Sequence, residues 1–179
     1  MIAEILYKMI HGFPPVVNEG ATRLILGSMP GQRSLQEDRY YAHPQNAFWR
    51  IIFAIFDGVG NDKRHIDNNY AHGLKLLKSA DIGLWDVLQT CTREGSLDAD
   101  IIETSVIANN FSKLLAEYPT IQKIYFNGAK AQQLYERYVL PALDDQKKDI
   151  TMIKLPSTSP AYAAMSFEKK LRLWRQVAQ

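Results

Sequence analysis

Side chains suited to hydrolytic or binding chemistry stand at four points of the chain. Asn46 ends the segment YYAHPQN, Asp86 follows the apolar run IGLW, Asn127 follows IYF, and hydroxyl side chains fill the segment 157–159. An amide oxygen can orient a water molecule, a carboxylate or an amide can hydrogen-bond the edge of a ring, and hydroxyl groups can bind phosphate oxygens. These residues can act together only if the fold brings the four points to one place.

A short glycine-containing loop, GSMPG, is a further candidate. It follows the apolar segment RLIL and consists of Gly27, Ser28, Met29, Pro30 and Gly31. Glycine lets a ligand approach the backbone closely, and free amide groups in such a loop can face a carbonyl or phosphate oxygen. A tight turn between a strand and a helix accounts for the same pattern equally well.

Each of the remaining candidates can also have an ordinary structural role. Tyr40 and Tyr41 can stack on a base, or they can cover the edge of the core. Asn46 can be a helix N-cap, and it combines capping with catalysis only if its amide oxygen faces the cleft. Asp86 can cap a helix or form an ion pair, and Asn127 can begin a left-handed turn. The local pattern alone leaves both roles open.

Four short apolar segments predict the strands that position these residues. Each ends at a turn or loop signal and is typical of a buried parallel strand: Arg23–Gly27, 82–88, 121–127 and Thr151–Leu155. Helical patterns separate the segments, which predicts an α/β domain. Ligands of open parallel sheets bind beyond the carboxyl ends of the strands, and the candidate residues follow those ends.

Four helices are predicted from apolar residues that recur on one helical face. They contain Phe48, Ile51, Ile52 and Ile55; then Ile107, Phe111, Leu114 and Leu115; then Ala129–Tyr138, ending near Pro141; and last Phe167, Leu171 and Trp174, with Ser166 as N-cap and Glu168 in the first turn. The polar segment 57–69 is predicted to be a loop inside the domain.

Length and composition predict one soluble domain over residues 1–179, because a chain with 46% hydrophobic residues can bury one substantial core. The formal net charge of +2 neither supports nor excludes binding to nucleic acid. The lone Cys91 and four scattered histidines predict no disulfide, no metal site and no iron–sulfur cluster. We see no signal-peptide pattern and no apolar run of membrane length, so we expect an intracellular, cytoplasmic protein without a membrane partner.

The motifs GSMPG, YYAHPQNAFW and LPSTSPA, in this order, resemble the uracil-DNA glycosylase superfamily. Its hypoxanthine-DNA glycosylase family is the most similar, and the segments GLWDVLQTCTREGSLDADI and IYFNG also resemble that family. The resemblance therefore covers nearly the whole chain. It implies a three-layer α/β/α sandwich with a four-stranded parallel sheet, in agreement with the strand candidates. It also implies a monofunctional DNA glycosylase of base excision repair, which needs no cofactor and hydrolyses the N-glycosidic bond of a deaminated base.

The resemblance also implies roles for individual residues. Related mismatch-specific uracil glycosylases carry a water-activating asparagine at the position of Met29, and a methionine cannot do that work. The hypoxanthine-DNA glycosylase family is similar in lacking this asparagine and relies on the one in its HPxN segment, which is Asn46 here. The implied base-binding residues are Gly27, Ser28, Met29, Pro30, Gly31, Tyr41, Asp86 and Asn127, with the Tyr41 ring under the flipped base. The implied DNA-binding residues are Ser157, Thr158, Ser159 and Tyr162.

The resemblance makes hypoxanthine the expected substrate, and an Asp86 carboxylate could accept its N1 hydrogen while repelling the N1 acceptor of adenine. Uracil offers a similar edge and is a possible second substrate. Arg33 and Arg39 are further candidates for phosphate contacts. No lysine is placed as a Schiff-base nucleophile, so we expect no lyase step. We expect DNA with a damaged base as the partner, no obligate protein partner, and a monomer.

Two alternatives stay open from the sequence, and a third is disfavoured. The chain can be a non-catalytic DNA-binding module of the same fold, an idea that Met29 motivates. It can also be a uracil-specific or mismatch-specific glycosylase. A nucleotide hydrolase is disfavoured, because neither a Lys-Ser/Thr pair nor a carboxylate cluster suited to magnesium accompanies the glycine loop.

Overall fold

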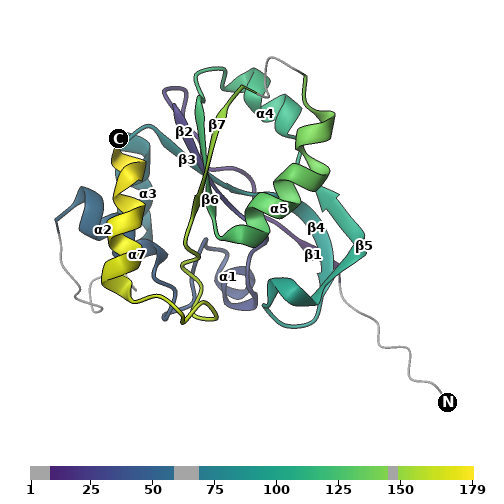
Figure 1. Cartoon of the computed structure of the whole chain (residues 1–179), viewed down its shortest axis with the longest axis horizontal. Coiled ribbons are helices and arrows are strands. Elements are labelled where there is room, and N and C mark those ends of the chain that lie inside the picture. The colour runs from purple at the N-terminus through teal and green to yellow at the C-terminus, as the bar shows by residue number, and fades with distance from the viewer. Residues whose placement is uncertain (1–8, 59–68, 145–148) are drawn as a thin grey trace.

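A four-stranded parallel sheet forms the centre of the molecule. The computed structural model describes residues 9–58, 69–144 and 149–179. The strands are β2 (Arg23–Gly27), β3 (Ile82–Asp86), β6 (Lys123–Asn127) and β7 (Thr151–Leu155), and they lie in the order β3-β2-β6-β7 (Figure 1). All three strand pairs are parallel, so the carboxyl ends of the four strands meet at one edge.

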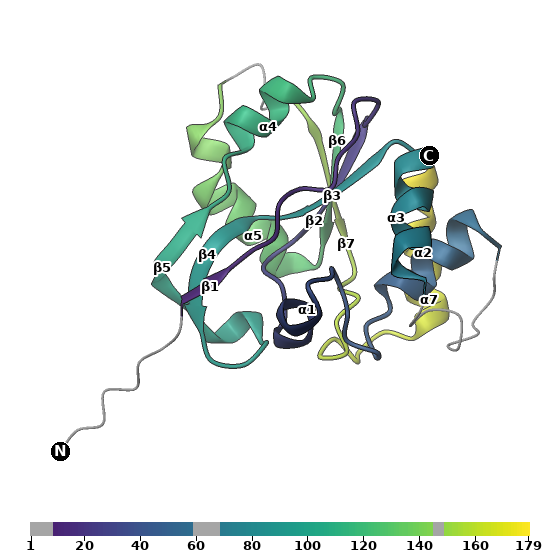
Figure 2. The same ribbon diagram turned by 180° about the vertical axis from the view of Figure 1, so that it is seen from behind.

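Helices cover both faces of this sheet. One face carries α2 (Phe48–Phe56), α3 (Tyr70–Ser79) and α7 (Phe167–Trp174), and the other carries α4 (Phe111–Glu117) and α5 (Ala129–Tyr138) (Figure 1). The short helix α1 (Gln32–Glu37) and the loop after β7 both lie beyond the carboxyl ends of the strands (Figure 2). Short 3-10 turns complete the chain: η2 (Asp98–Asp100), η3 (Leu140–Ala142) and η4 (Arg175–Ala178). The predicted α/β fold with a four-stranded parallel sheet is confirmed.

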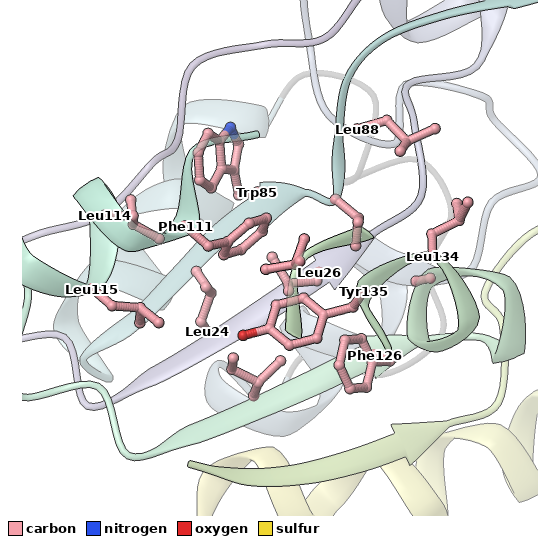
Figure 3. Packing of buried hydrophobic residues seen from close by; sticks show 14 of the residues in the cluster. Leu24, Leu26, Trp85, Leu88, Phe111, Leu114, Leu115, Phe126, Leu134 and Tyr135 are labelled. Atoms are coloured by element: carbon pink, nitrogen blue, oxygen red, sulfur yellow. The ribbon is translucent and has the colours of Figure 1, made fainter. Parts of the chain in front are cut away.

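The strands send alternate side chains into two apolar clusters, one on each face of the sheet. Leu24 and Leu26 of β2 join the cluster beneath α4 and α5, whereas Ile25 between them joins the cluster beneath α2, α3 and α7. Figure 3 shows the first cluster, where Phe111 and Tyr135 pack edge to face with ring centroids 5.1 Å apart. This alternation follows from the period of two in a strand. Burial on both faces is the reason that β2, β3 and β6 are nearly continuous apolar runs in the sequence, whereas β7 keeps Thr151 and Lys154 exposed.

A second sheet, which the sequence did not lead us to expect, lies beside the α4 and α5 layer. It is antiparallel and contains β1 (Met9–His11), β4 (Leu88–Arg93) and β5 (Ile101–Ala108) in the order β1-β4-β5. The predicted strand 82–88 therefore ends at Asp86, and Leu88 already begins β4. The amide groups of Val87 and Leu88 bond to the carbonyl groups of Gly27 and Ser28, so the chain continues along the glycine loop before it leaves the main sheet. The predicted strand 121–127 is similarly shorter and begins at Lys123.

The predicted helical face that included Ile107 is wrong at its first residue. Ile107 belongs to β5 and is 52% exposed, and α4 begins only at Phe111. Asn110 separates the two elements and caps α4, because its side chain accepts a hydrogen bond from the Lys113 amide. A polar N-cap therefore divides what looks like one continuous helical pattern.

Two helix boundaries agree with the sequence patterns. The third predicted helix coincides with α5, and η3 follows it around Pro141. Ser166 caps α7 by accepting a hydrogen bond from the Lys169 amide, and Trp174 of this helix is fully buried. Most of the predicted loop 57–69 lies outside the described residues. Among those residues, no helix is both long and apolar enough to cross a bilayer.

Candidate active site

A cavity of about 420 Å³ lies beyond the carboxyl ends of the parallel strands, within the size range of small-molecule sites. Its walls come from the glycine loop with α1, the segment before α2, the turn that leads into η2, and the loop after β7. Every residue that the sequence assigned to the site lines this cavity except Tyr162: the lining includes Gly27, Ser28, Met29, Pro30, Gly31, Tyr41, Asn46, Asp86, Asn127, Ser157, Thr158 and Ser159. The parallel topology thus gathers four distant segments.

Asp86 lies against the glycine loop in the deepest polar part of the site. It is the register partner of Gly27 and is only 3% exposed, and its Oδ2 atom has no hydrogen-bond partner. A Cβ atom on Gly27 would overlap Asp86 Oδ1. Glycine at position 27 is therefore required by the close approach of this carboxyl group.

Burial raises the pKa of Asp86 from its ordinary 3.8 to about 7, since the interior disfavours the charged form. The nearby Asp98 carboxylate is the second cause of this rise, whereas the Arg93 guanidinium lowers the pKa of Asp86. A substantial fraction of Asp86 is therefore protonated at neutral pH. The carboxylate expected from the sequence is only one of two forms present.

Tyr41 places its ring beside this carboxyl group. The ring stacks on Phe48 of α2 with centroids 4.0 Å apart and planes at 26°, and the backbone of Tyr41 is left-handed with φ of 53°. Its hydroxyl group is buried without a hydrogen-bond partner, and burial raises the pKa of Tyr41 strongly. A phenol in this setting stays neutral and leaves an unused polar atom beside Asp86.

Asn46 combines a structural bond with a place in the cavity. Its Oδ1 atom accepts a hydrogen bond of 3.0 Å from the Phe48 amide at the start of α2, and its own backbone amide donates to the His43 carbonyl. Ala47 holds the formal N-cap position without a side-chain bond, so the prediction of Asn46 as the N-cap is displaced by one residue. A carbonyl oxygen has two lone pairs, so Oδ1 can bind the Phe48 amide and a water molecule at the same time.

Asn127 fastens the loop after β7 to the sheet. Its amide nitrogen donates to the Thr158 hydroxyl and its amide oxygen accepts from the Thr158 backbone, both at 2.8 Å. The Thr158 carbonyl in turn accepts from the Ala47 amide. Asn127 therefore lines the cavity, but these bonds make it position the loop and the segment that carries Asn46.

The loop after β7 ends in an exposed aromatic side chain. Ser157 and Ser159 accept backbone hydrogen bonds within the loop, which gives it an ordered shape. Tyr162 follows with 39% of its surface exposed, and the buried Lys170 donates to its carbonyl and lies 5.1 Å from its ring centroid. Tyr162 stands outside the cavity and is available for contact with a large ligand.

Sequence reasoning missed a second carboxylate, Asp98, and its partners. Asp98 lines the cavity, accepts a hydrogen bond of 2.7 Å from Ser28 Oγ, and lies 3.5 Å from Arg93 Nη1. The Arg93 side chain is completely buried and donates a hydrogen bond to the Pro30 carbonyl, so it holds the glycine loop in place. The segment TREGSLDAD contained these charges, but the strand that carries Arg93 was not predicted.

Several further candidates have different surroundings from those expected. Arg33 and Arg39 both pair with Glu37, so their charges are already partly neutralised. Met29 lines the cavity but is only 6% exposed, so most of its side chain packs in the core. Within the described part of the chain, no group of three or more histidine, cysteine or acidic residues is arranged to hold a metal ion.

Comparisons with known proteins agree with this architecture. A family model for the Uracil DNA glycosylase superfamily matches residues 14–178. A protein of Methanosarcina barkeri (strain Fusaro / DSM 804) named "Hypoxanthine DNA glycosylase" is 42% identical over 121 residues, which cover 68% of this chain and 72% of that protein. A protein of the same name from Methanosarcina acetivorans is 39% identical over 140 residues, covering 74% and 84%.

A solved structure extends the agreement to three dimensions. The solution NMR structure of a proposed uracil DNA glycosylase from Methanosarcina acetivorans superposes with a TM-score of 0.72 and 34% sequence identity. The match covers 96% of this chain and 100% of that one. By sequence and by fold, the chain belongs to the uracil-DNA glycosylase superfamily.

Proposed function

We propose that this protein releases hypoxanthine from DNA by hydrolysing the bond between the base and its deoxyribose. The observation that carries the proposal is the meeting of Asn46, Asp86 and Tyr41 in one cavity at the end of the sheet. These residues supply an amide oxygen for a water molecule, a polar group for the base edge and an aromatic ring for stacking. The two relatives named hypoxanthine DNA glycosylase support the same substrate.

Asn46 is the proposed catalytic residue. Breaking the bond between sugar and base builds positive charge on the sugar and negative charge on the base, so the enzyme needs a placed water rather than a strong nucleophile. Asn46 would hold this water through Oδ1, which keeps a lone pair beside its bond to the Phe48 amide. Backbone amides of the loop 27–31 would stabilise the charge on the departing base. We propose no lyase step, and among the described residues the cavity lining includes no lysine.

The loop after β7 is the proposed contact with DNA. The target nucleotide must leave the duplex to reach the cavity, which costs a few kcal/mol and costs least for a poorly paired base. Ser157 to Ser159 would bind phosphate groups, and the exposed Tyr162 would fill the space that the nucleotide leaves. We further infer that one copy of the chain acts alone, because one cavity suffices for chemistry on one base, and that it acts in the cell compartment that holds DNA.

Incubation with labelled DNA tests the proposal directly. Purified protein is mixed with duplexes that contain one hypoxanthine, one uracil or only normal bases, and alkali then breaks the strand at any abasic site. We expect breaks at hypoxanthine and none at normal bases, with the strand intact until alkali is added. Preference for uracil, whose edge is similar, would assign the protein to a neighbouring activity. Folded protein that binds these duplexes without releasing any base would identify a binding module instead.

A further inference from the structure

The cavity holds two carboxyl groups in different environments. Asp86 is 3% exposed and its Oδ2 atom has no partner, whereas Asp98 accepts a hydrogen bond from Ser28 and faces the Arg93 guanidinium. Arrangements of this kind divide the roles of two acids, because the group with hydrogen-bond and cationic partners ionises first. The negative charge on that group then favours the proton on its neighbour.

From this geometry we infer that Asp86 acts as a neutral carboxylic acid that protonates the departing base, and that Asp98 is the positioning residue that keeps the proton on Asp86. The inference rests on the proposed function and adds a general acid to it. It replaces the sequence-based expectation that Asp86 accepts a hydrogen from the base as a carboxylate.

The surroundings of Asp86 favour this assignment. Tyr40 and Tyr41 lie near it as phenols whose pKa values burial raises, and Asp98 faces it as a second acid. Burial raises the pKa of Asp98 too, but the Ser28 hydrogen bond and two cations, Arg93 and Lys130, lower it, and of these cations only Arg93 also acts on Asp86. Burial is the largest cause of the raised pKa of Asp86, and Asp98 comes second. Arg93 lies within ion-pair distance of Asp98 and also bonds to Pro30, so its charge is directed mainly at Asp98 and the glycine loop. Oδ2 of Asp86 has no hydrogen-bond partner, so a proton on this oxygen is free to be donated to a base in the cavity.

The proposed step balances in protons and electrons. The Asp86 proton moves to N7 of hypoxanthine while the bond between C1′ and N9 breaks. The electron pair of that bond stays on the base. The added proton cancels the negative charge that would otherwise build up on the base, so the base leaves neutral, and the oxygen of the water held by Asn46 adds to C1′. The proton that this water loses returns through solvent to the Asp86 carboxylate. Proton transfer of this kind contributes about 10²-fold or more to a rate.

The pH dependence of hypoxanthine release tests the inference, because the two forms of Asp86 predict opposite profiles. A general acid must be protonated, so the single-turnover rate is expected to fall above about pH 7. Asp98→Asn removes a negative neighbour and lowers the pKa of Asp86, so the fall is expected at lower pH, with several-fold less activity at pH 8 and little change at pH 5.5. Asp86→Asn is expected to lose about 100-fold at pH 6 and to show no fall at alkaline pH.

Asp100→Asn is the matched control, because Asp100 belongs to the same η2 turn, is exposed and does not line the cavity. It is expected to leave the profile unchanged. The amide oxygen introduced by Asp98→Asn can still accept from Ser28, and thermal unfolding verifies that each variant is folded. Two results would overturn the inference while base release remained established. One is a rate that decreases as the pH is lowered below 7, and the other is a decrease above pH 7 whose midpoint is the same in Asp98→Asn and the parent. Absence of release at every pH would overturn the proposed function itself.

Discussion

Asn46→Ala is expected to lower the rate of hypoxanthine release about 10³-fold while the protein still binds DNA. The variant loses the amide oxygen that would orient the attacking water, and misplacing a reactant by about 1 Å already costs about 10²-fold. It also loses the hydrogen bond to the Phe48 amide, which costs about 1 kcal/mol of stability at the start of α2. Single-turnover rates and DNA affinity, measured on the same preparation, separate these two effects.

Asn110→Ala provides the matched control for this variant. Asn110 makes the same kind of bond, to the Lys113 amide at the start of α4, but does not line the cavity. Both variants should lose similar stability, and only Asn46→Ala should lose activity. Equal activity of the two variants would remove Asn46 from the mechanism and leave it as a structural residue.

Gly27→Ala is expected to abolish base release almost completely, by about 10³-fold or more. The added Cβ atom would overlap Asp86 Oδ1 and lie 2.9 Å from the Tyr41 hydroxyl oxygen, so both groups must move away from the base. The fold should survive, because Asp86 and Tyr41 both line the cavity and can shift toward it. Release of hypoxanthine under single-turnover conditions, with thermal unfolding as the test of folding, measures the effect.

Gly83→Ala places a similar collision in the core. Its Cβ atom would lie 2.9 Å from Val17 Cγ2 and 3.0 Å from Leu24 Cδ1, on the strand β3 that also carries Asp86. Overpacking of this kind typically costs about 1–3 kcal/mol. This variant should therefore be less stable than Gly27→Ala but more active, and the reverse order would mean that the close approach at Gly27 is a packing requirement only.

The main sheet could be predicted because β2, β3 and β6 are almost wholly buried, and short apolar runs bounded by turn residues are typical of buried parallel strands. The strand Thr151–Leu155 is more exposed, but its length and its position between turn signals still mark it as a strand. The small antiparallel sheet could not be predicted in the same way. Leu88–Arg93 mixes polar and apolar residues, and its pairing with distant partners has a register irregularity that blurs the alternation.

The site residues at the strand ends could be predicted for a topological reason. Parallel strands that end together bring the residues after them to one edge, so Asp86 and Asn127 were expected near each other without knowledge of their contacts. Asp98 could not be placed, because it depends on the unpredicted strand β4 and the turn after it. The hydrogen bond between Asn127 and Thr158 could not be predicted either, since a contact between a strand end and a distant loop leaves no periodic pattern in the sequence.

The unpartnered Asp86 also makes the free energy of unfolding depend on pH. Its pKa rises from 3.8 to about 7 on folding, so the folded chain retains a proton that the unfolded chain has lost. Stability contributed by this proton is complete below pH 3.8 and declines until about pH 7, a total loss of about 4 kcal/mol. Asp86→Asn cannot ionise, so denaturant unfolding should show the variant gaining about 3 kcal/mol relative to the parent between about pH 4.5 and pH 7.5. A difference that stayed constant with pH would mean that Asp86 ionises freely in the folded protein. At neutral pH the fold thus keeps, in the cavity beyond the strand ends, a carboxyl group that lowers its stability, as is expected where a functional site is maintained at the expense of stability.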